Sequence, residues 1–279
     1  MLLGVRAHDF GRQDADSLFK KIAAVGFNCC QIAPAKAITG INHFNDITDA
    51  HMEEIATAAD KHAVALSVLG CYIEPSVADT QERLANVEIF KRNLTLAKNF
   101  RIPIVGTETT MLPPDALTEV PTALLYGTRR KVYDILLDSV LRMVDHAEKE
   151  NVIIGIEPVA DHTLHTATLT RRLLDDVGSN KLKVIFDPVN ILRNKTTTVS
   201  ITKRFISLLY NDIVALHIKD TSFNGTEKVW QHIGDGIIDY ALIAKLLADK
   251  KIPLLREGVK PETAHRDFQT IKEIFSYNR

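Results

Sequence analysis

The chain has 279 residues, of which 46% are hydrophobic and 25% charged, as expected for a soluble globular protein with a large core. Its 34 basic and 35 acidic residues give a formal charge of −1, so there is no basic excess to hold a phosphate backbone, and nucleic acid is not expected as a partner. There is no apolar run of bilayer-spanning length and no signal-peptide pattern, and Cys29, Cys30 and Cys71 make a poor disulfide framework, so we expect no membrane association and a cytoplasmic location.

Short β-branched runs alternate with longer segments of helical period in the first half of the chain. The run 2–7 precedes a predicted helix over 14–26, in which Leu18, Ile22 and Val25 mark one face. Three more strand–helix pairs follow, with strands predicted at 28–34, 63–70 and 102–108 and helices at 49–62, 79–100 and 128–150. The longest irregular stretch, 107–127, follows the fourth strand and is predicted to be an active-site loop.

The second half repeats the alternation, with strands predicted at 152–157, 182–187, 213–220 and 252–257, each followed by a helix. Eight such units imply parallel strands with right-handed crossovers, and the length suits a closed barrel. We therefore predict an α/β fold, a single (β/α)8 TIM barrel, with residues 1–279 forming one domain. A doubly wound sheet is the rival, but the segment 6–14 lacks the GxGxxG turn expected after its first strand.

Four of these strands end on residues of the types that bind metals. Glu157, Asp187, His217 and Glu257 close the last four strands, and they are spaced 30, 30 and 40 residues apart. The last interval is longer because residues 221–236 are inserted as a loop after strand seven. A single carboxylate at a strand end is usually a helix cap, but four at matching positions would converge on one barrel mouth. A divalent cation would neutralise them, and three oxygens with one nitrogen suit Mn²⁺, Mg²⁺, Co²⁺ or Zn²⁺.

The sequence resembles the xylose-isomerase-like TIM-barrel superfamily, specifically its sugar phosphate isomerase/epimerase members. The matching stretches are "GCYIEP" (70–75), "VGTET" (105–109), "GIEPVADH" (155–162), "VIFDPVNIL" (184–192), "ALHIKD" (215–220) and "IGDG" (233–236). The resemblance implies that Glu157, Asp187, His217 and Glu257 bind one metal, and that Glu157 and Glu257 also exchange the substrate proton. DNA-repair members of the superfamily carry extra histidines for further zinc ions, whereas "GCYIEP" and "VGTET" contain no histidine and "DPVN" has Asn190 where the nucleases have one.

Further polar residues follow other strands and are candidates for binding sugar hydroxyls. His8, Gln31, Tyr72 and Glu108 follow strands one to four, and loop capping is the alternative role for each. His162 and Asn190 come shortly after two of the predicted ligands, and His165 could take the place of His162. Lys219, together with Asp220, follows His217, and the two could orient the site or pair with each other. Trp230, the sole tryptophan, could provide an apolar wall or only pack.

The leading functional hypothesis is a metal-dependent isomerase or epimerase of a ketose, a sugar phosphate or a related polyol, working through a metal-stabilised enediolate. One glutamate would remove the proton and the other would return it. An inosose-type dehydratase would need much the same residues, and a sugar-binding barrel without catalysis is the third alternative. The expected partner is a small-molecule sugar, and a homo-oligomer is compatible with the sequence.

Overall fold

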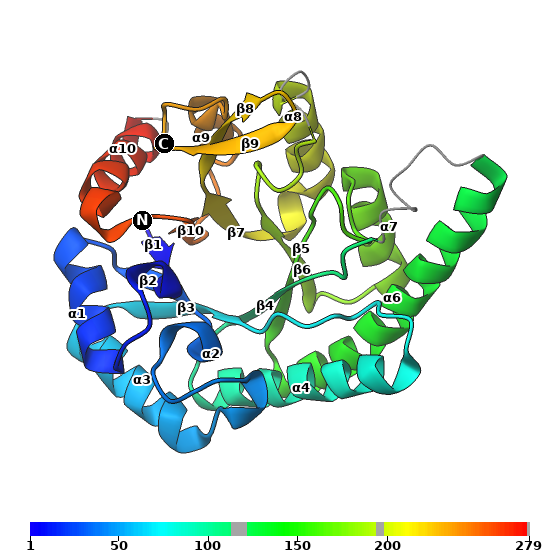
Figure 1. Ribbon diagram of the computed structural model, residues 1–279, viewed down its shortest axis with the longest axis horizontal. Helices are drawn as coiled ribbons and strands as arrows, with labels where there is room; N and C mark the ends of the chain where they lie inside the picture. Colours follow the sequence, from blue (N-terminus) through cyan, green and yellow to red (C-terminus); the bar gives the residue numbers. More distant parts are fainter. Residues whose placement is uncertain (113–121, 194–197, 278–279) are drawn as a thin grey trace.

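The computed structural model describes residues 1–112, 122–193 and 198–277. Eight parallel strands form a closed barrel in the order β1-β10-β7-β6-β5-β4-β3-β2, with the helices outside it (Figure 1). The predicted (β/α)8 barrel is confirmed. The barrel strands are β1 (Leu3–Arg6), β2 (Cys29–Ile32), β3 (Ala65–Gly70), β4 (Ile104–Glu108), β5 (Ile153–Glu157), β6 (Leu182–Phe186), β7 (Ile213–Ile218) and β10 (Leu254–Arg256).

The helices between the strands pack apolar faces on the barrel. In the first of them Leu18, Phe19 and Ile22 are buried, and the Asp14 carboxylate caps its start by accepting the backbone N–H of Ser17 at 2.8 Å. Within the described residues, no helix is both long enough and apolar enough to span a membrane. The helices are α1 (Ala15–Val25), α2 (Pro34–Ala37), α3 (Asp49–Lys61), α4 (Thr80–Asn99), α6 (Thr122–Glu150), α7 (Ala167–Val177), α8 (Thr198–Leu209), α9 (Tyr240–Leu246) and α10 (Ala264–Tyr277).

Two segments that were predicted to be loops contain regular secondary structure. Helix α6 begins at Thr122 rather than near residue 128, because it runs through Gly127, whose cost of about 1 kcal/mol a long helix can absorb. The active-site loop predicted at 107–127 is therefore wrong at its helical end, and its middle, 113–121, lies outside the described residues. The insertion after strand seven is not an irregular loop but an antiparallel hairpin of β8 (Asp220–Asn224) and β9 (Glu227–Gln231).

The hairpin is fastened to the barrel at its base. The buried carboxylate of Asp220 accepts the backbone N–H groups of Thr221, Gly234, Gly236 and Ile238 at 2.9–3.2 Å. Lys228, on β9, donates to the backbone oxygen of Val189 after β6 at 2.9 Å. The carboxylate of Asp220 thus binds the backbone at the base of the hairpin. It does not pair with Lys219, which was one of the two roles that the sequence suggested.

The interior of the barrel is closed by a small apolar layer, the barrel plug. It comprises Cys29, Val68, Ile104, Ile185, Ala215 and Leu255, one from each of six strands. Gly155 on β5 leaves room for this layer, since a Cβ there would lie 2.8 Å from Ile185 Cγ1. Side chains alternate along a strand, so residues two positions beyond the plug also point inward, at the carboxyl end of the barrel.

Candidate metal centre

Four inward side chains meet at the carboxyl end of the barrel, and we call them the mouth cluster: Glu157, Asp187, His217 and Glu257. Three of them stand two residues after the plug residues Ile185, Ala215 and Leu255, and Glu157 stands two after Gly155. One ligand atom from each lies within 4.8 Å of all the others. The alternation of the strands therefore produces the convergence that the sequence spacing predicted.

Two of the carboxylates are each held by one oxygen. Asp187 Oδ1 accepts the backbone N–H groups of Val189 and Asn190 at 2.8 and 3.0 Å. Glu157 Oε1 accepts Nδ2 of Asn190 at 2.6 Å. The turn after β6 therefore orients both side chains, and it leaves Asp187 Oδ2 and Glu157 Oε2 directed at the centre of the cluster.

The other two members of the mouth cluster are held in the same manner. Glu257 Oε1 accepts Nη1 of Arg6 at 2.6 Å and Nζ of Lys219 at 2.9 Å. His217 Nε2 lies 2.8 Å from Oε1 of Gln31. The remaining atoms, Glu257 Oε2 and His217 Nδ1, face the centre and lie 3.1 Å from each other.

The unanchored atoms of the cluster suit a cation. His217 Nδ1 and Asp187 Oδ2 are buried and make no well-directed hydrogen bond, although charged groups lie within 4 Å of both. Each of the four side chains thus has one atom held by a hydrogen bond and one atom turned to the centre, where Asp187 Oδ2 also lies 2.9 Å from the Lys219 ammonium. Three carboxylate oxygens and one imidazole nitrogen fit a hard or intermediate divalent ion such as Mn²⁺, Mg²⁺, Co²⁺ or Zn²⁺.

The charges of the cluster are strongly coupled. Burial opposes the protonated form of His217, but Glu157 and Glu257 raise its pKa to about 10. Burial likewise opposes the charge of Glu257, yet Lys219, His217 and Arg6 hold its pKa well below the usual range. For Asp187 burial prevails over Lys219 and raises the pKa. The carboxylates thus favour a proton on His217, and a divalent cation bound at the centre would displace that proton and take over its charge.

The other predicted site residues lie around this cluster in different roles. Lys219 places Nζ 2.9 Å from both Asp187 Oδ2 and Glu257 Oε1, so it bridges two predicted ligands. Asn190 reaches the mouth, but one of its donors is taken by Glu157. Glu108 pairs in register with Glu157, and burial together with Glu157 and Glu257 raises the pKa of Glu108 to about 7.

Three further candidates flank the mouth. Burial, Arg6 and Lys36 lower the pKa of His8 to about 3, so its ring is neutral near pH 7. Tyr72 follows β3 and bonds Gln31 through its hydroxyl. His162 pairs with Met111 in an isolated bridge, and its buried Nδ1 has no hydrogen-bond partner within the described residues. Contact of these side chains with a sugar stays a prediction.

Sequence reasoning missed Arg6 and Asp9. Arg6 ends β1, two residues after the inward Gly4, at the level of the mouth cluster. Besides Glu257 it binds Asp9 Oδ1, at 3.0 and 2.8 Å through Nε and Nη2, and Asp9 Oδ2 accepts the backbone N–H of Gly258 at 2.6 Å. The two residues fasten the end of β10 to β1. The position of Arg6 at the end of the first strand, with Asp9 shortly after it, is the feature of the sequence that could have indicated their place at the mouth.

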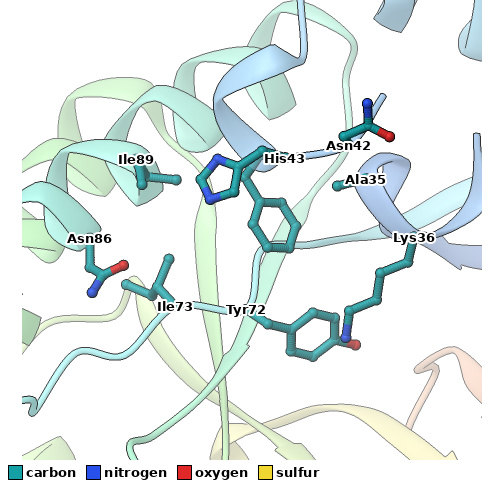
Figure 2. A pocket seen from close by; sticks show the side chains of 9 residues that line it. Ala35, Lys36, Asn42, His43, Tyr72, Ile73, Asn86 and Ile89 are labelled. Carbon is teal, nitrogen blue, oxygen red and sulfur yellow. The ribbon is translucent and has the colours of Figure 1, made fainter. Parts of the chain in front are cut away.

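Two features border the mouth. Trp230 on the hairpin is 61% exposed, and the Lys219 ammonium lies 5.6 Å from the centre of its ring. On the opposite side, behind Tyr72, is a cavity of about 200 Å³ between α2, the end of β3 and α4 (Figure 2). Lys36, His43, Tyr72, Ile73, Asn86 and Ile89 are among the residues that line it.

A closed (β/α)8 barrel with a carboxylate-rich cluster at its mouth defines a class of barrels with a candidate metal centre at their strand ends. Residues 19–267 match the family model described as xylose isomerase-like TIM barrel, and the chain belongs to this family. Comparison with curated proteins gives no match.

Solved structures share the fold at low sequence identity. A D-tagatose 3-epimerase-like protein is 16% identical with a TM-score of 0.79, covering 100% of this chain and 98% of the other. The 3-keto-D-glucoside 4-epimerase YcjR from E. coli is 14% identical with a TM-score of 0.75, covering 98% and 99%. The IOLI protein with a zinc atom bound is 16% identical with a TM-score of 0.74, covering 100% and 99%.

Proposed function

We propose that the protein is a divalent-metal-dependent isomerase or epimerase of a ketose, a sugar phosphate or a related polyol. The observation that carries the proposal is the mouth cluster, in which four side chains each turn one ligand-type atom to a common centre and are held through the other. The epimerases among the structural neighbours support the same class of reaction. A divalent cation held there would polarise the substrate carbonyl and stabilise negative charge on its oxygen.

The two glutamates are the proposed proton-transfer groups. Glu157 lies on β5 and Glu257 follows β10, with β6 and β7 between these strands in the barrel, so the two carboxylates approach the centre from different directions. A substrate carbon between them would lose its proton to one glutamate and regain it from the other, and the enediolate would form in the interval. Lys219, between Asp187 and Glu257, is placed to donate a hydrogen bond to a substrate oxygen.

The test is hydrogen exchange with solvent. The protein, loaded with Mn²⁺ or Co²⁺, is incubated in D₂O with a panel of ketoses and ketose phosphates, and NMR follows deuterium at the carbons next to the carbonyl. We expect exchange and an isomeric product of unchanged mass with at least one sugar, and none after metal removal. A product lighter by one water would support the dehydratase alternative. Tight sugar binding with no exchange for any member would support the non-catalytic barrel.

A further inference from the structure

A hydrogen-bonded chain leads from the mouth cluster across the barrel interior to the wall of the cavity in Figure 2. His217, on β7, contacts Gln31, on β2, at 2.8 Å between Nε2 and Oε1. Gln31 in turn donates through its own Nε2 to the hydroxyl of Tyr72. Gln31 is 1% exposed and His217 is 2% exposed, so water does not compete for these contacts.

The histidine can ligate with only one of its ring nitrogens. Nδ1 faces the cluster, 3.2 Å from Glu157 Oε2 and 3.1 Å from Glu257 Oε2. Nε2 faces the carbonyl oxygen of Gln31, which can only accept, so the ring hydrogen must sit on Nε2. When a metal displaces the proton from Nδ1, the ring is neutral and its lone pair is on Nδ1. A reversed amide would place its NH₂ group against Nε2 and force the hydrogen onto Nδ1, where it would block ligation.

Tyr72 is the last residue of this series of hydrogen bonds. The Lys36 ammonium lies 4.0 Å from the centre of the Tyr72 ring, and the ring also lines the cavity (Figure 2). Gly70, at the end of β3, makes room for it, since a Cβ there would lie 3.2 Å from Tyr72 Cε2. The ring thus lies against Gly70 and beneath the Lys36 ammonium, and its hydroxyl accepts the hydrogen bond from the amide of Gln31.

We infer that Gln31 is a positioning residue that fixes the tautomer and the ring orientation of His217, so that Nδ1 is the atom presented to a metal, with Tyr72 as its support. The inference rests on the metal site of the proposed function. A hydrogen bond from the non-ligating nitrogen to a fixed acceptor is the usual means of orienting a histidine ligand, and its loss typically costs about 10- to 100-fold in metal affinity.

The experiment compares Co²⁺ binding in four variants of the full chain. Gln31→Met keeps the size and removes the acceptor, whereas Gln31→Glu keeps an oxygen facing Nε2. Tyr72→Phe removes only the support. The matched control is Gln231→Met, because Gln231 also donates through its side chain, to Ser222 Oγ at 2.9 Å, but on the hairpin. Affinity is measured by competition with a chelator, the visible Co²⁺ spectrum reports the ligand field, and thermal unfolding checks the fold.

We expect Gln31→Met to weaken Co²⁺ binding by about 10- to 100-fold and to change the spectrum. Gln31→Glu and the control should stay close to wild type, with Tyr72→Phe between the two groups. Wild-type affinity and spectrum in a folded Gln31→Met, or an equal loss in Gln31→Glu, would overturn this inference alone. Wild-type protein that took up no Co²⁺, Mn²⁺, Mg²⁺ or Zn²⁺ would overturn the metal site and the inference together.

Discussion

Replacing Glu157 with glutamine should separate its two proposed roles, metal ligation and proton transfer, when Asn190 is replaced at the same time. In the structure Nδ2 of Asn190 donates to Glu157 Oε1, and Oε2 faces the cluster. A glutamine at 157 has one oxygen only. The NH₂ group of Asn190 donates its hydrogen bond to that oxygen. The amide nitrogen of the glutamine then faces the metal, which it cannot bind.

The size of the effect follows from that conflict. If the glutamine instead turned its oxygen to the metal, two NH₂ groups would face each other, and a buried donor left without an acceptor costs about 1–3 kcal/mol. Since about 1.4 kcal/mol corresponds to a tenfold change, Glu157→Gln should weaken metal binding by roughly 10- to 100-fold. Loss of the base should lower turnover by about 10²-fold or more, even at saturating metal.

The double variant Glu157→Gln/Asn190→Asp removes the conflict. The new carboxylate at 190 accepts the glutamine NH₂ group, and the glutamine oxygen then faces the metal. We expect metal affinity to return to within about threefold of wild type, while turnover and D₂O exchange stay low because the base is still missing. Metal affinity is measured by chelator competition, and exchange by NMR, with the exposed Glu53→Gln on α3 as control. Wild-type metal affinity in the single variant, or no recovery in the double, would refute the reasoning.

Three further outcomes are expected. Chelation should abolish turnover and leave the circular dichroism spectrum nearly unchanged, since the barrel plug is apolar; collapse of the helical signal would contradict this. Asp220→Ala should lower the free energy of unfolding by at least about 3 kcal/mol, because four backbone N–H groups lose their acceptor, whereas the exposed Asp249→Ala should have little effect in the same denaturant titration. With a formal charge of −1, the protein should not nick or specifically bind an abasic duplex, and salt-sensitive binding in a gel-shift assay would speak against a sugar substrate.

The mouth cluster could be anticipated because its members repeat one position in consecutive strand–helix units. Arg6 occupies the same position in the first unit, but a single arginine after a strand resembles any solvated surface residue. The hydrogen bond from Asn190 to Glu157 could not be anticipated, because it depends on the short turn after β6, and contact of Asn190 with a substrate stays a prediction. A residue's nearness to a ligand in sequence does not tell which of its neighbours it will bind.

The two departures in the fold have local causes. The hairpin turns through Gly225 and Thr226, since Asn224 already pairs with Glu227, and Gly225 has a positive φ of 61°. Glycine at the first central position of a two-residue turn is a known hairpin signal that the sequence did contain. The helix predicted from residue 128 begins at Thr122 and includes Gly127, because helix propensity is a weak prior and one glycine does not end a helix. The assignment of residues 1–279 to one domain stays a prediction.

The offset of two residues between the barrel plug and the mouth makes the protein a convenient starting point for directed evolution. Replacing Ala215 or Leu255 would disturb the layer that closes the barrel. Replacing a mouth residue such as Glu108 or Lys219, on the same faces of their strands, would change the chemistry presented to a ligand and leave that layer intact. A library confined to the mouth positions would thus explore new substrates without altering the apolar layer, and a variant at Lys219 would have to replace the positive charge that pairs with Asp187 and Glu257.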